Sequence, residues 1–465
     1  MDYDSKKEDY KNDTEGEKKY YVVESKKPEE IIAAAPTFEG LFQNIPKGGS
    51  IAAMPGFHDG VVYFSSLDTH VYALDAETGE MIWKFKTGAP AMTAPLVHNK
   101  RVYFGSHDEH FYCLDLTGKL IWKKHLGDII VSYPTGVVDK IFIAAGKTFF
   151  CLSEQGEELW KFVTGNGIFT SPTLVNETIF ISSFDKHIYA LDMNGKLKWK
   201  FGAGHNVSTP LIFSDNKALF TLKKRSWDAI PKAENPVLYS ASADNNLYAL
   251  NQKGEVIWKF NCGSSFFTIV TGDNGTVYVG SITGHIYAVD AATGRQKWNF
   301  RTGGMITGGV ALKDDRVYVN SWDQKIYCLS TNGEKLWDFL TGGPIVAEPL
   351  IAGNKIYFGS ADTFFYCLDA EKRTVEWTFQ CGFGMPDILK TKITDIVNTF
   401  TDYEKKIFKV WVPETKAAHA GGSSMQNYNL PAGFSFGGEQ LYSSSNAGAY
   451  KSGSNYLSKR KPYNK

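Results

Sequence analysis

The sequence predicts an all-β fold, an eight-bladed β-propeller of four-stranded antiparallel blades. A unit of about 40 residues recurs eight times, and a tryptophan at one fixed position of the unit recurs at a spacing of 38–40 residues, with a single spacing of 59. Aromatic residues make up 14% of the chain and glycines number 44, which favours many short strands joined by tight turns. Repeats of this length and type predict propeller blades. The blade tryptophans are Trp83, Trp122, Trp160, Trp199, Trp258, Trp298, Trp337 and Trp377.

Each unit reads as four strands, expected in the second unit at Met92–Val97, Arg101–Ser106, Phe111–Asp115 and Leu120–Lys124. The third and fourth strands are joined by an Asp-x-x-Thr-Gly sequence, as at Asp75–Gly79. This sequence suits a hairpin turn, because the Asp side chain accepts hydrogen bonds from turn amides and Gly adopts positive φ. We expect the tryptophan of the fourth strand to pack against the neighbouring blade.

Composition divides the chain into four regions. Residues 1–36 are charged and polar and are predicted to be a disordered N-terminal tail. The propeller is assigned to 37–382, and 383–417 to a helix followed by a strand. Residues 418–465, rich in Gly, Ser, Asn and Tyr, are predicted to be a second disordered tail.

The spacing of 59 residues indicates an insertion, 214–235, between the first two strands of blade five. We expect it on the face that bears the Thr-Gly turns. Arg and Trp are enriched in interface hot spots, so the insertion is a candidate partner interface that deletion would remove without disturbing the blade cores. The alternative is a loop folded back over its own blade. The candidate interface residues are Lys223, Lys224, Arg225, Trp227 and Ile230.

Charge and hydropathy exclude several classes of protein. Lys and Arg number 50 and Asp and Glu number 50, so a concentrated basic surface for nucleic acid is not expected. No apolar run approaches the ~18–20 residues of a membrane span. The first 30 residues lack the apolar stretch of a secretory signal. We therefore expect a cytoplasmic protein or a part of an intracellular structural assembly.

Cysteine and histidine recur at repeated packing positions. Four cysteines replace the alanine found at Ala73 in the third strand, which favours buried free thiols and a reducing compartment. Four histidines share one turn position, too far apart around a ring to bind one metal. No metal site is expected. The cysteines are Cys113, Cys151, Cys328 and Cys367, and the histidines are His70, His110, His187 and His285.

The axial channel is the place to look for chemistry, and alignment on Pro95 gives two rings of first-strand residues, of which only one faces the channel because side chains alternate along a strand. Neither ring holds paired carboxylates for acid–base catalysis or several oxygen ligands for calcium. Catalytic and cofactor-binding residues are therefore not assigned. One ring is Ala53, Thr93, Ser132, Thr170, Ser208, Thr268, Thr307 and Ala347; the next is Met54, Ala94, Tyr133, Ser171, Thr209, Ile269, Gly308 and Glu348.

The sequence Tyr-Ala-Leu-Asp-x-x-Thr-Gly-x-x-x-Trp at Tyr72–Trp83, nearly repeated at Tyr287–Trp298, resembles the pyrroloquinoline-quinone (PQQ) repeat with its tryptophan-docking motif. The resemblance covers about Ser50 to Gly382 and implies eight blades. The family has a quinoprotein dehydrogenase branch and a non-catalytic branch typified by the propeller lipoprotein of the bacterial outer-membrane barrel-assembly machine. The dehydrogenase branch implies a calcium ligated by Glu, Asn and Asp, a catalytic Asp and often an adjacent cysteine pair, and none occurs at matching positions.

The sequence therefore favours the non-catalytic branch. We expect a protein–protein interaction scaffold within a larger assembly, with protein partners, no cofactor and no enzymatic activity. Two alternatives stay open: a PQQ-dependent quinoprotein oxidoreductase, and a propeller that binds a small ligand or glycan.

Overall fold

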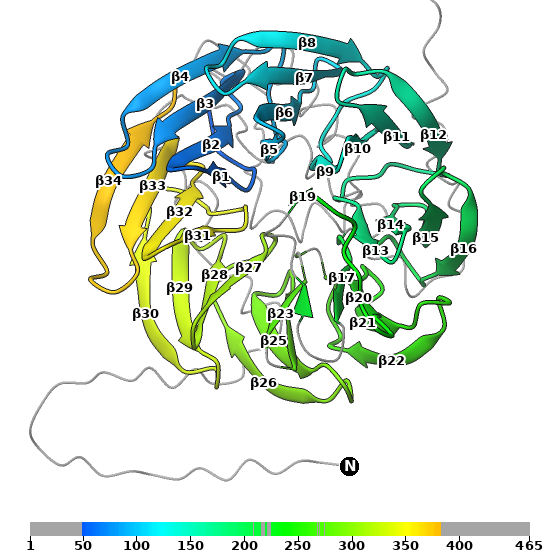
Figure 1. Cartoon of the computed structure of the whole chain (residues 1–465). Coiled ribbons are helices and arrows are strands. Elements are labelled where there is room, and N and C mark those ends of the chain that lie inside the picture. Colours follow the sequence, from blue (N-terminus) through cyan, green and yellow to red (C-terminus); the bar gives the residue numbers. More distant parts are fainter. Residues whose placement is uncertain are drawn as a thin grey trace, which may run out of the picture.

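The computed structural model describes residues 49–207, 209–214, 219–220, 225–266, 268, 270–273 and 275–382. Their strands form eight sheets arranged as a ring around a central axis (Figure 1). The predicted eight-bladed propeller of antiparallel blades is confirmed. Both predicted tails, the helix–strand extension at 383–417, Lys223 and Lys224 lie outside the described residues.

The strands of each blade follow one another in sequence, beginning at the axis. Blade one is β1 (Gly56–His58), β2 (Val61–Ser65), β3 (His70–Asp75) and β4 (Met81–Lys86). Blade two is β5 (Leu96–His98), β6 (Arg101–Gly105), β7 (His110–Asp115) and β8 (Leu120–His125). Blade three is β9 (Thr135–Val137), β10 (Lys140–Ala145), β11 (Thr148–Ser153) and β12 (Glu158–Val163). Blade four is β13 (Thr173–Val175), β14 (Thr178–Ser182), β15 (His187–Asp192) and β16 (Leu197–Gly202).

The second half of the ring continues the pattern. Blade five is β17 (Ile212–Ser214), β20 (Val237–Ala241), β21 (Asn246–Leu250) and β22 (Val256–Asn261). Blade six is β23 (Thr271–Asp273), β24 (Thr276–Gly280), β25 (His285–Asp290) and β26 (Gln296–Arg301). Blade seven is β27 (Val310–Lys313), β28 (Arg316–Asn320), β29 (Lys325–Ser330) and β30 (Lys335–Leu340). Blade eight is β31 (Leu350–Ala352), β32 (Lys355–Gly359), β33 (Phe364–Asp369) and β34 (Val375–Gln380).

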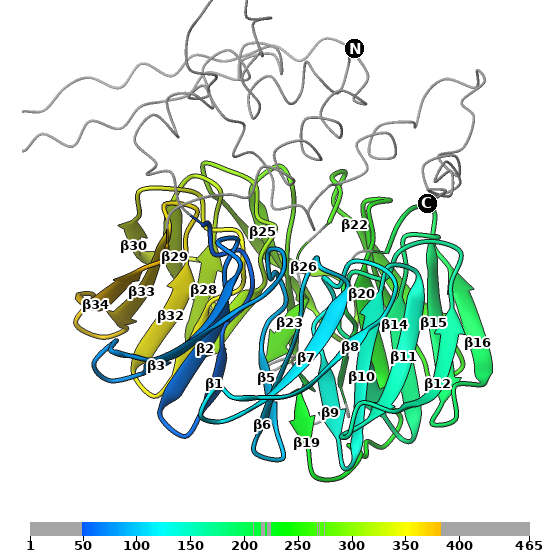
Figure 2. The ribbon, with the colours of Figure 1, turned by 90° about the horizontal axis from the view of Figure 1, so that it is seen from above.

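Two blades gain a fifth strand from the insertion of blade five. Strand β18 (Leu219–Phe220) pairs antiparallel with β17 of its own blade. Strand β19 (Ser226–Trp227) instead pairs parallel with β9 of blade three. Figure 2 shows β19 beside β9 at one face of the ring. The insertion therefore links blades that are not neighbours in the ring.

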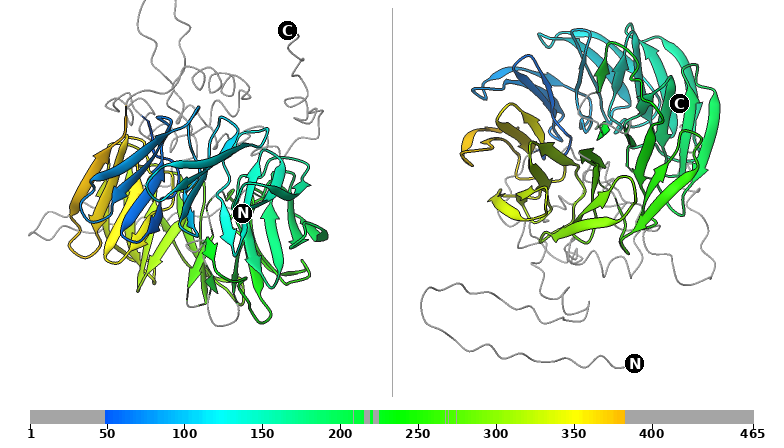
Figure 3. Two further views of the ribbon diagram at one scale, coloured as in Figure 1. Left: turned by 45° about the horizontal axis from the view of Figure 1, so that its top comes forward. Right: turned by 60° about the horizontal axis from the view of Figure 1, so that its bottom comes forward.

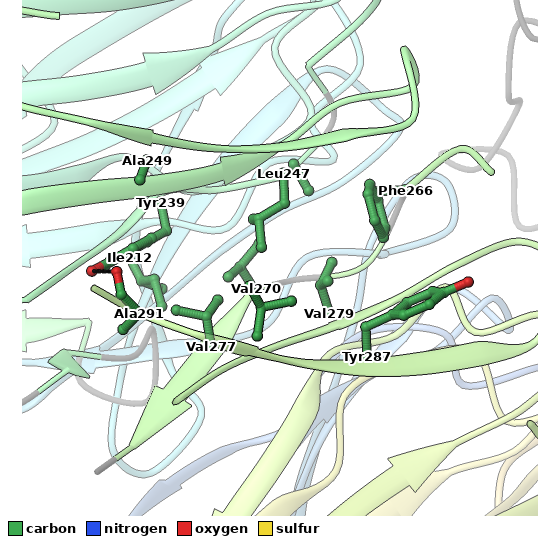
Figure 4. Close-up of a cluster of buried hydrophobic side chains, with 12 residues drawn as sticks. Ile212, Tyr239, Leu247, Ala249, Phe266, Val270, Val277, Val279, Tyr287 and Ala291 are labelled. Atoms are coloured by element: carbon green, nitrogen blue, oxygen red, sulfur yellow. Dashed lines mark hydrogen bonds between the residues drawn. The ribbon is translucent and has the colours of Figure 1, made fainter. Parts of the chain in front are cut away.

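The hydrophobic core lies between adjacent blades. Each third strand is buried on both faces, as the pattern of β7 shows, because a blade covers each side. Figure 4 shows one such cluster, in which Tyr239 and Leu247 of blade five meet Val277 and Val279 of blade six. The packing of each blade against its neighbours thus stabilises the ring. In the outer strands, exposed and partly buried side chains alternate, as in β8.

The ring closes by contact between the last blade and the first, which lie side by side in Figures 1 and 3. The Tyr357 hydroxyl donates to the carbonyl of Ala76 at 2.9 Å. The rings of Phe64 and Phe365 stack with centroids 4.1 Å apart. No strand of the described blades crosses this seam, so closure depends on packing between two complete blades.

The tryptophans join each blade to the next. Trp258 Nε1 donates to the carbonyl of Ala291, in the turn of the following blade, at 3.0 Å. A Cβ added to Gly294 of the same turn would lie 2.7 Å from the Trp258 ring, so only glycine allows this stacking. Six other tryptophans donate in the same way: Trp83, Trp122, Trp160, Trp199, Trp298 and Trp377.

The repeated cysteine position lies opposite the tryptophan. Cys113 pairs with Trp122 across the third and fourth strands, as Ala73 pairs with Trp83. Burial raises the pKa of Cys113 and of Cys151 to about 12. All six cysteines are described as free thiols, five of them buried.

Candidate functional site

Strand register assigns the wall of the channel to rings and corrects the sequence alignment in two blades. The pair Val97 and Val102 of blade two corresponds to Phe213 and Leu238 in blade five. Thr209 therefore takes the place of Thr93, and the expected Ser208 lies outside the described residues. The alignment failed because Pro210 is not the equivalent of Pro95.

Blade seven shows the same kind of shift. Its pair Leu312 and Val317 corresponds to Val97 and Val102, so Gly308 rather than Thr307 occupies the place of Thr93. Blade seven has no proline in this strand to mark the register. The second ring then reads Met54, Ala94, Tyr133, Ser171, Pro210, Gly309 and Glu348, with Ile269 outside the described residues.

The first ring is turned away from the channel. The hydroxyl of Thr93 accepts from the Gly105 amide at 2.8 Å and donates to the Gly105 carbonyl at 3.1 Å. Ser132 makes the same pair of bonds with Ala144, and both side chains are fully buried. These hydroxyls stabilise the second strand of their own blade. Because side chains alternate along a strand, the second ring faces the channel.

Apolar side chains close the end of the channel at the face formed by the loops between strands two and three. They come from five blades and include the indole of Trp322, whose Nε1 donates to Thr307 Oγ1 at 2.6 Å. The buried members are Ala52, Leu67, Met92, Ala243, Met305, Trp322 and Val346. We call them the mouth layer.

Arg225 lies immediately before β19. Its side chain enters the channel from the face opposite the mouth layer. Its Nη1 donates to the carbonyls of Ala94 at 3.0 Å and Pro134 at 3.2 Å, and Nη2 donates to that of Pro95 at 3.0 Å. The guanidinium carbon lies 5.6 Å from the centre of the Tyr133 ring. One side chain thus joins the insertion of blade five to blades two and three.

The backbone of the insertion is held equally firmly. The amides of Gly136 and Val138 donate to the carbonyls of Arg225 and Trp227, each at 2.8 Å. His98 Nδ1 lies 2.8 Å from the Ser226 hydroxyl. These contacts explain why a segment far along the chain lies on blade three.

The expected partner interface stays a prediction, and the structure shows where three of its residues lie. Arg225 is buried against backbone carbonyls and does not present its charge to solvent. Trp227 and Ile230 pack, partly buried, against the core between blades three and four. The alternative of folding back on its own blade holds for β18 but not for β19. The insertion does lie on the expected face, with the loops between strands one and two.

Electrostatics in the channel centre on this buried cation. Burial lowers the pKa of Arg225 to about 10, while Tyr133 and Glu348 act in the opposite direction. Burial also raises the pKa of Tyr133. A buried charge is costly unless its donors are satisfied, and here three carbonyls accept from the guanidinium. In the described part of the channel, the donors of Arg225 are thus directed at backbone carbonyls.

A quinone cofactor of the dehydrogenase branch would need open space, free cationic donors and a calcium site of several oxygen ligands. The mouth layer fills one end of the channel with packed apolar side chains. The donors of Arg225 are directed at backbone carbonyls. In the described part of the chain, no group of three or more His, Cys, Asp or Glu is placed to hold a metal ion. The residues of this channel do not fit the cofactor.

Sequence reasoning missed an aspartate that recurs in the loops between strands two and three, on the same face as the mouth layer. Asp185 Oδ1 accepts from the His187 amide at 3.1 Å, and Oδ2 accepts from the Tyr189 hydroxyl and the Gly165 amide of the preceding blade, each at 2.6 Å. The sequence pattern that could have identified this site is an Asp with Tyr four residues later and Gly twenty residues earlier. The same set of bonds occurs at Asp68, Asp108, Asp244, Asp323 and Asp362. The spacing between Asp and Gly differs at two of them: Asp68 pairs with Gly382 of the last blade, and the insertion of blade five separates Asp244 from Gly204.

These carboxylates join blades and are not available for chemistry. Burial and the Asp185 carboxylate raise the pKa of Tyr189 well above its usual range. The repeated histidines belong to the same turns: Nδ1 of His110 and of His187 each lies 2.8 Å from the carbonyl oxygen two residues earlier. Within the described ranges, no helix is long and apolar enough to span a membrane.

The family model described as Outer membrane protein assembly factor BamB matches residues 36–129, 116–220, 214–305 and 301–391. Tetrathionate hydrolase from Acidithiobacillus ferrooxidans is 28% identical over 166 residues, which is 32% of this chain and 33% of that protein. The chain thus spans about a third of the length of this curated relative.

Solved structures share the fold at low identity. BamB from Moraxella catarrhalis superposes with a TM-score of 0.56 and 18% identity, over 66% of this chain and 91% of that one. The computationally designed Ika8 protein gives 0.58 and 15%, over 69% and 96%. Quinohemoprotein alcohol dehydrogenase from Comamonas testosteroni gives 0.56 and 16%, over 69% and 72%. At these identities the likeness shows the fold alone.

Proposed function

The chain belongs to the family described as Outer membrane protein assembly factor BamB, and on that premise we propose that it is a non-catalytic protein–protein interaction scaffold. We propose further that it works as a subunit of a larger assembly. The observation that carries this proposal is the closure of the channel, at one end by the mouth layer and within by Arg225. A propeller closed in this way offers its outer surfaces, rather than its axis, for binding.

The outer surface supports the proposal. The outermost strands expose large apolar side chains, as Ile82 and Ile121 show, at 51% and 45% exposure. Trp227 and Ile230 also keep part of their surface, so their role in partner binding stays a prediction. These exposed strands are the surface that the proposal assigns to contact with a protein partner.

An oxidoreductase or hydrolase is the second candidate, because the chain is similar to a tetrathionate hydrolase in sequence and to a quinohemoprotein dehydrogenase in fold. The match to the hydrolase covers 33% of that protein, and the dehydrogenase is 16% identical to this chain. Glu348, 3% exposed in the channel wall, is the carboxylate that such an enzyme would use.

The test uses the full-length protein in two parallel assays. Calorimetry with PQQ and Ca²⁺, dye-linked alcohol oxidation and tetrathionate hydrolysis should all give no binding or turnover. Chemical cross-linking followed by reconstitution with the captured purified partner should give a complex of fixed stoichiometry. Turnover that Glu348→Gln abolishes would overturn the proposal and place the chemistry in the channel.

We also propose that the protein works in a reducing compartment, and the cytoplasm is the compartment we favour. The support is the free state of its six cysteines, five of which are buried. Alkylation in denaturant without reductant, after rapid quenching of cells, should label six thiols. Fewer labels would indicate a disulfide and contradict this location.

A further inference from the structure

A pocket of about 230 Å³ lies between blades six and seven, on the face that also carries the insertion. The two blades are neighbours in Figure 1. Thr276 and Lys297 of blade six form one side, and Asp314, Asp315 and Thr331 of blade seven form the other. The pocket is mostly polar and does not belong to the axial channel.

Two other blades, two and seven, show how a side chain of the chain itself can fill the corresponding space. Arg101, Thr276 and Arg316 each begin the second strand of their blade. Arg101 Nη1 donates to the carbonyl of Glu154 in the turn of the next blade at 2.7 Å. Arg316 Nη1 donates to that of Ala370 at 3.1 Å. At the interfaces of blade two with three and of blade seven with eight, a guanidinium therefore lies where blade six has only the short side chain of Thr276.

The acceptor in the pocket is the same type of carbonyl. Thr331 O accepts from Trp298 Nε1 at 2.7 Å, as Glu154 O accepts from Trp122 Nε1 at 2.8 Å. Glu154 O also accepts from Arg101, because a carbonyl has two lone pairs. Thr276 is too short to supply this second donor to Thr331. The pocket therefore repeats an arginine site without its arginine.

Charge at the rim favours a cationic occupant. Asp314 and Asp315 are both exposed, and the ion pair of Asp314 with Lys313 among the described residues is long, at 3.8 Å. Lys297 is held within blade six by Asp290 at 3.5 Å and by two further oxygens at 2.8 and 3.2 Å. The pocket's own cation is thus engaged, and two carboxylates remain at its opening.

We propose that this pocket is a docking site for an arginine side chain of a protein partner. The proposal rests on the proposed scaffold function and gives that function one specific contact. Arginine fits better than lysine because its planar fork supplies several donors, which reach the Thr331 carbonyl and a rim carboxylate together. A single arginine is expected to bind with a Kd on the order of 1 mM.

The test measures binding of N-acetyl-L-arginine methylamide to the full-length protein by saturation-transfer NMR. The citrulline analogue, of the same shape without charge, is the matched ligand and should bind at least tenfold more weakly. Thr276→Arg should abolish binding, because the chain then fills its own pocket as Arg101 does in blade two. Asp315→Asn should weaken binding severalfold. Asp139→Asn, in an exposed loop of blade three, should leave it unchanged.

Equal binding of arginine and citrulline would overturn the proposal, as would retained binding by Thr276→Arg with an unchanged melting temperature. If Thr276→Arg fails to fold, Asp315→Asn against Asp139→Asn decides the question. The outcome is separate from that of the proposed function. If the probe binds but no complex can be reconstituted, the scaffold function alone is refuted. If the probe does not bind but wild type and Asp315→Asn form the complex equally well, the docking site alone is refuted.

Discussion

At the residue scale, the turn glycines carry the closest contacts between blades. Gly294 has φ of +69° and would place a Cβ against Trp258, whereas Gly60 has φ of +75° with nothing within 4 Å of its Cβ. The pair separates two roles of glycine. One glycine serves backbone conformation alone, and the other also makes room for an indole.

Gly60→Ala should lower the free energy of unfolding by about 1 kcal/mol, the cost of left-handed backbone. Gly294→Ala should cost about 1–3 kcal/mol more, because overpacking against the ring adds to it. Urea denaturation of both variants measures the difference. Equal losses would mean that the tryptophan moves aside without penalty.

The turn aspartates make stability depend on pH. Asp290 Oδ1 accepts from the hydroxyl and the amide of Thr293 at 2.8 and 2.9 Å. The Thr293 hydroxyl is the main group that lowers the pKa of Asp290, helped by the Thr293 amide and by Lys297. A folded-state pKa below the unfolded value, about 3.9, stabilises the protein above that pH. The contribution is lost as pH falls through the folded pKa.

Asp290→Asn should therefore reduce stability at pH 7, and the difference from wild type should shrink as the pH falls below about 4 and through the lowered pKa of Asp290. Asn251, which accepts turn amides at the same place in blade five, shows that the amide can keep the turn. Urea unfolding at several pH values tests this. A difference that stays constant with pH would show that the charge of Asp290 plays no part.

At the scale of the element, the outer strand is bound to the next blade through its tryptophan, and blade seven departs from the rule. Trp337 Nε1 is buried without an acceptor among the described residues. The turn of blade eight has Arg373, at φ of +62°, in place of the usual glycine. The carbonyl of Ala370 accepts instead from Arg316.

Two matched substitutions follow. Trp298→Phe should lose the hydrogen bond to Thr331 as well as ring volume, and Trp337→Phe should lose ring volume only. We expect Trp298→Phe to cost about 1 kcal/mol more, the net worth of a hydrogen bond. Thermal and urea unfolding of both variants test this. A larger loss at Trp337 would contradict the assignment.

At the scale of the whole molecule, the insertion joins blades two, three and five through the channel. Deletion of residues 223–230, expected from the sequence to spare the cores, removes Arg225 together with the packing of Trp227 and Ile230. The structure therefore predicts that this deletion destabilises the propeller.

Arg225→Met should lower the free energy of unfolding by roughly 2–4 kcal/mol, because three buried carbonyls lose a charged donor. Asp228→Ala, at an exposed position of the same insertion, should have no effect and is the control. Chemical denaturation compares them. A variant with methionine as stable as wild type would show that apolar filling of the channel suffices.

The sequence by itself determined the blades. Tryptophan spacing, the Thr-Gly turns and the shared position of Ala73 and Cys113 are local features, and each repeat restates them. An error in one repeat is corrected by seven others. The fold class and the packing of the third strands followed from that redundancy.

The tertiary structure decided what is not repeated. Blades five and seven lack a proline equivalent to Pro95, so pairing between strands, which local sequence does not encode, set the register of Thr209 and Gly308. The path of the insertion depended on acceptors at Ala94 and Pro134, which lie 131 and 91 residues from Arg225 in the chain. A basic residue in a loop reads as exposed until the fold brings buried carbonyls to it, because burial of a charge is favourable only where such partners converge.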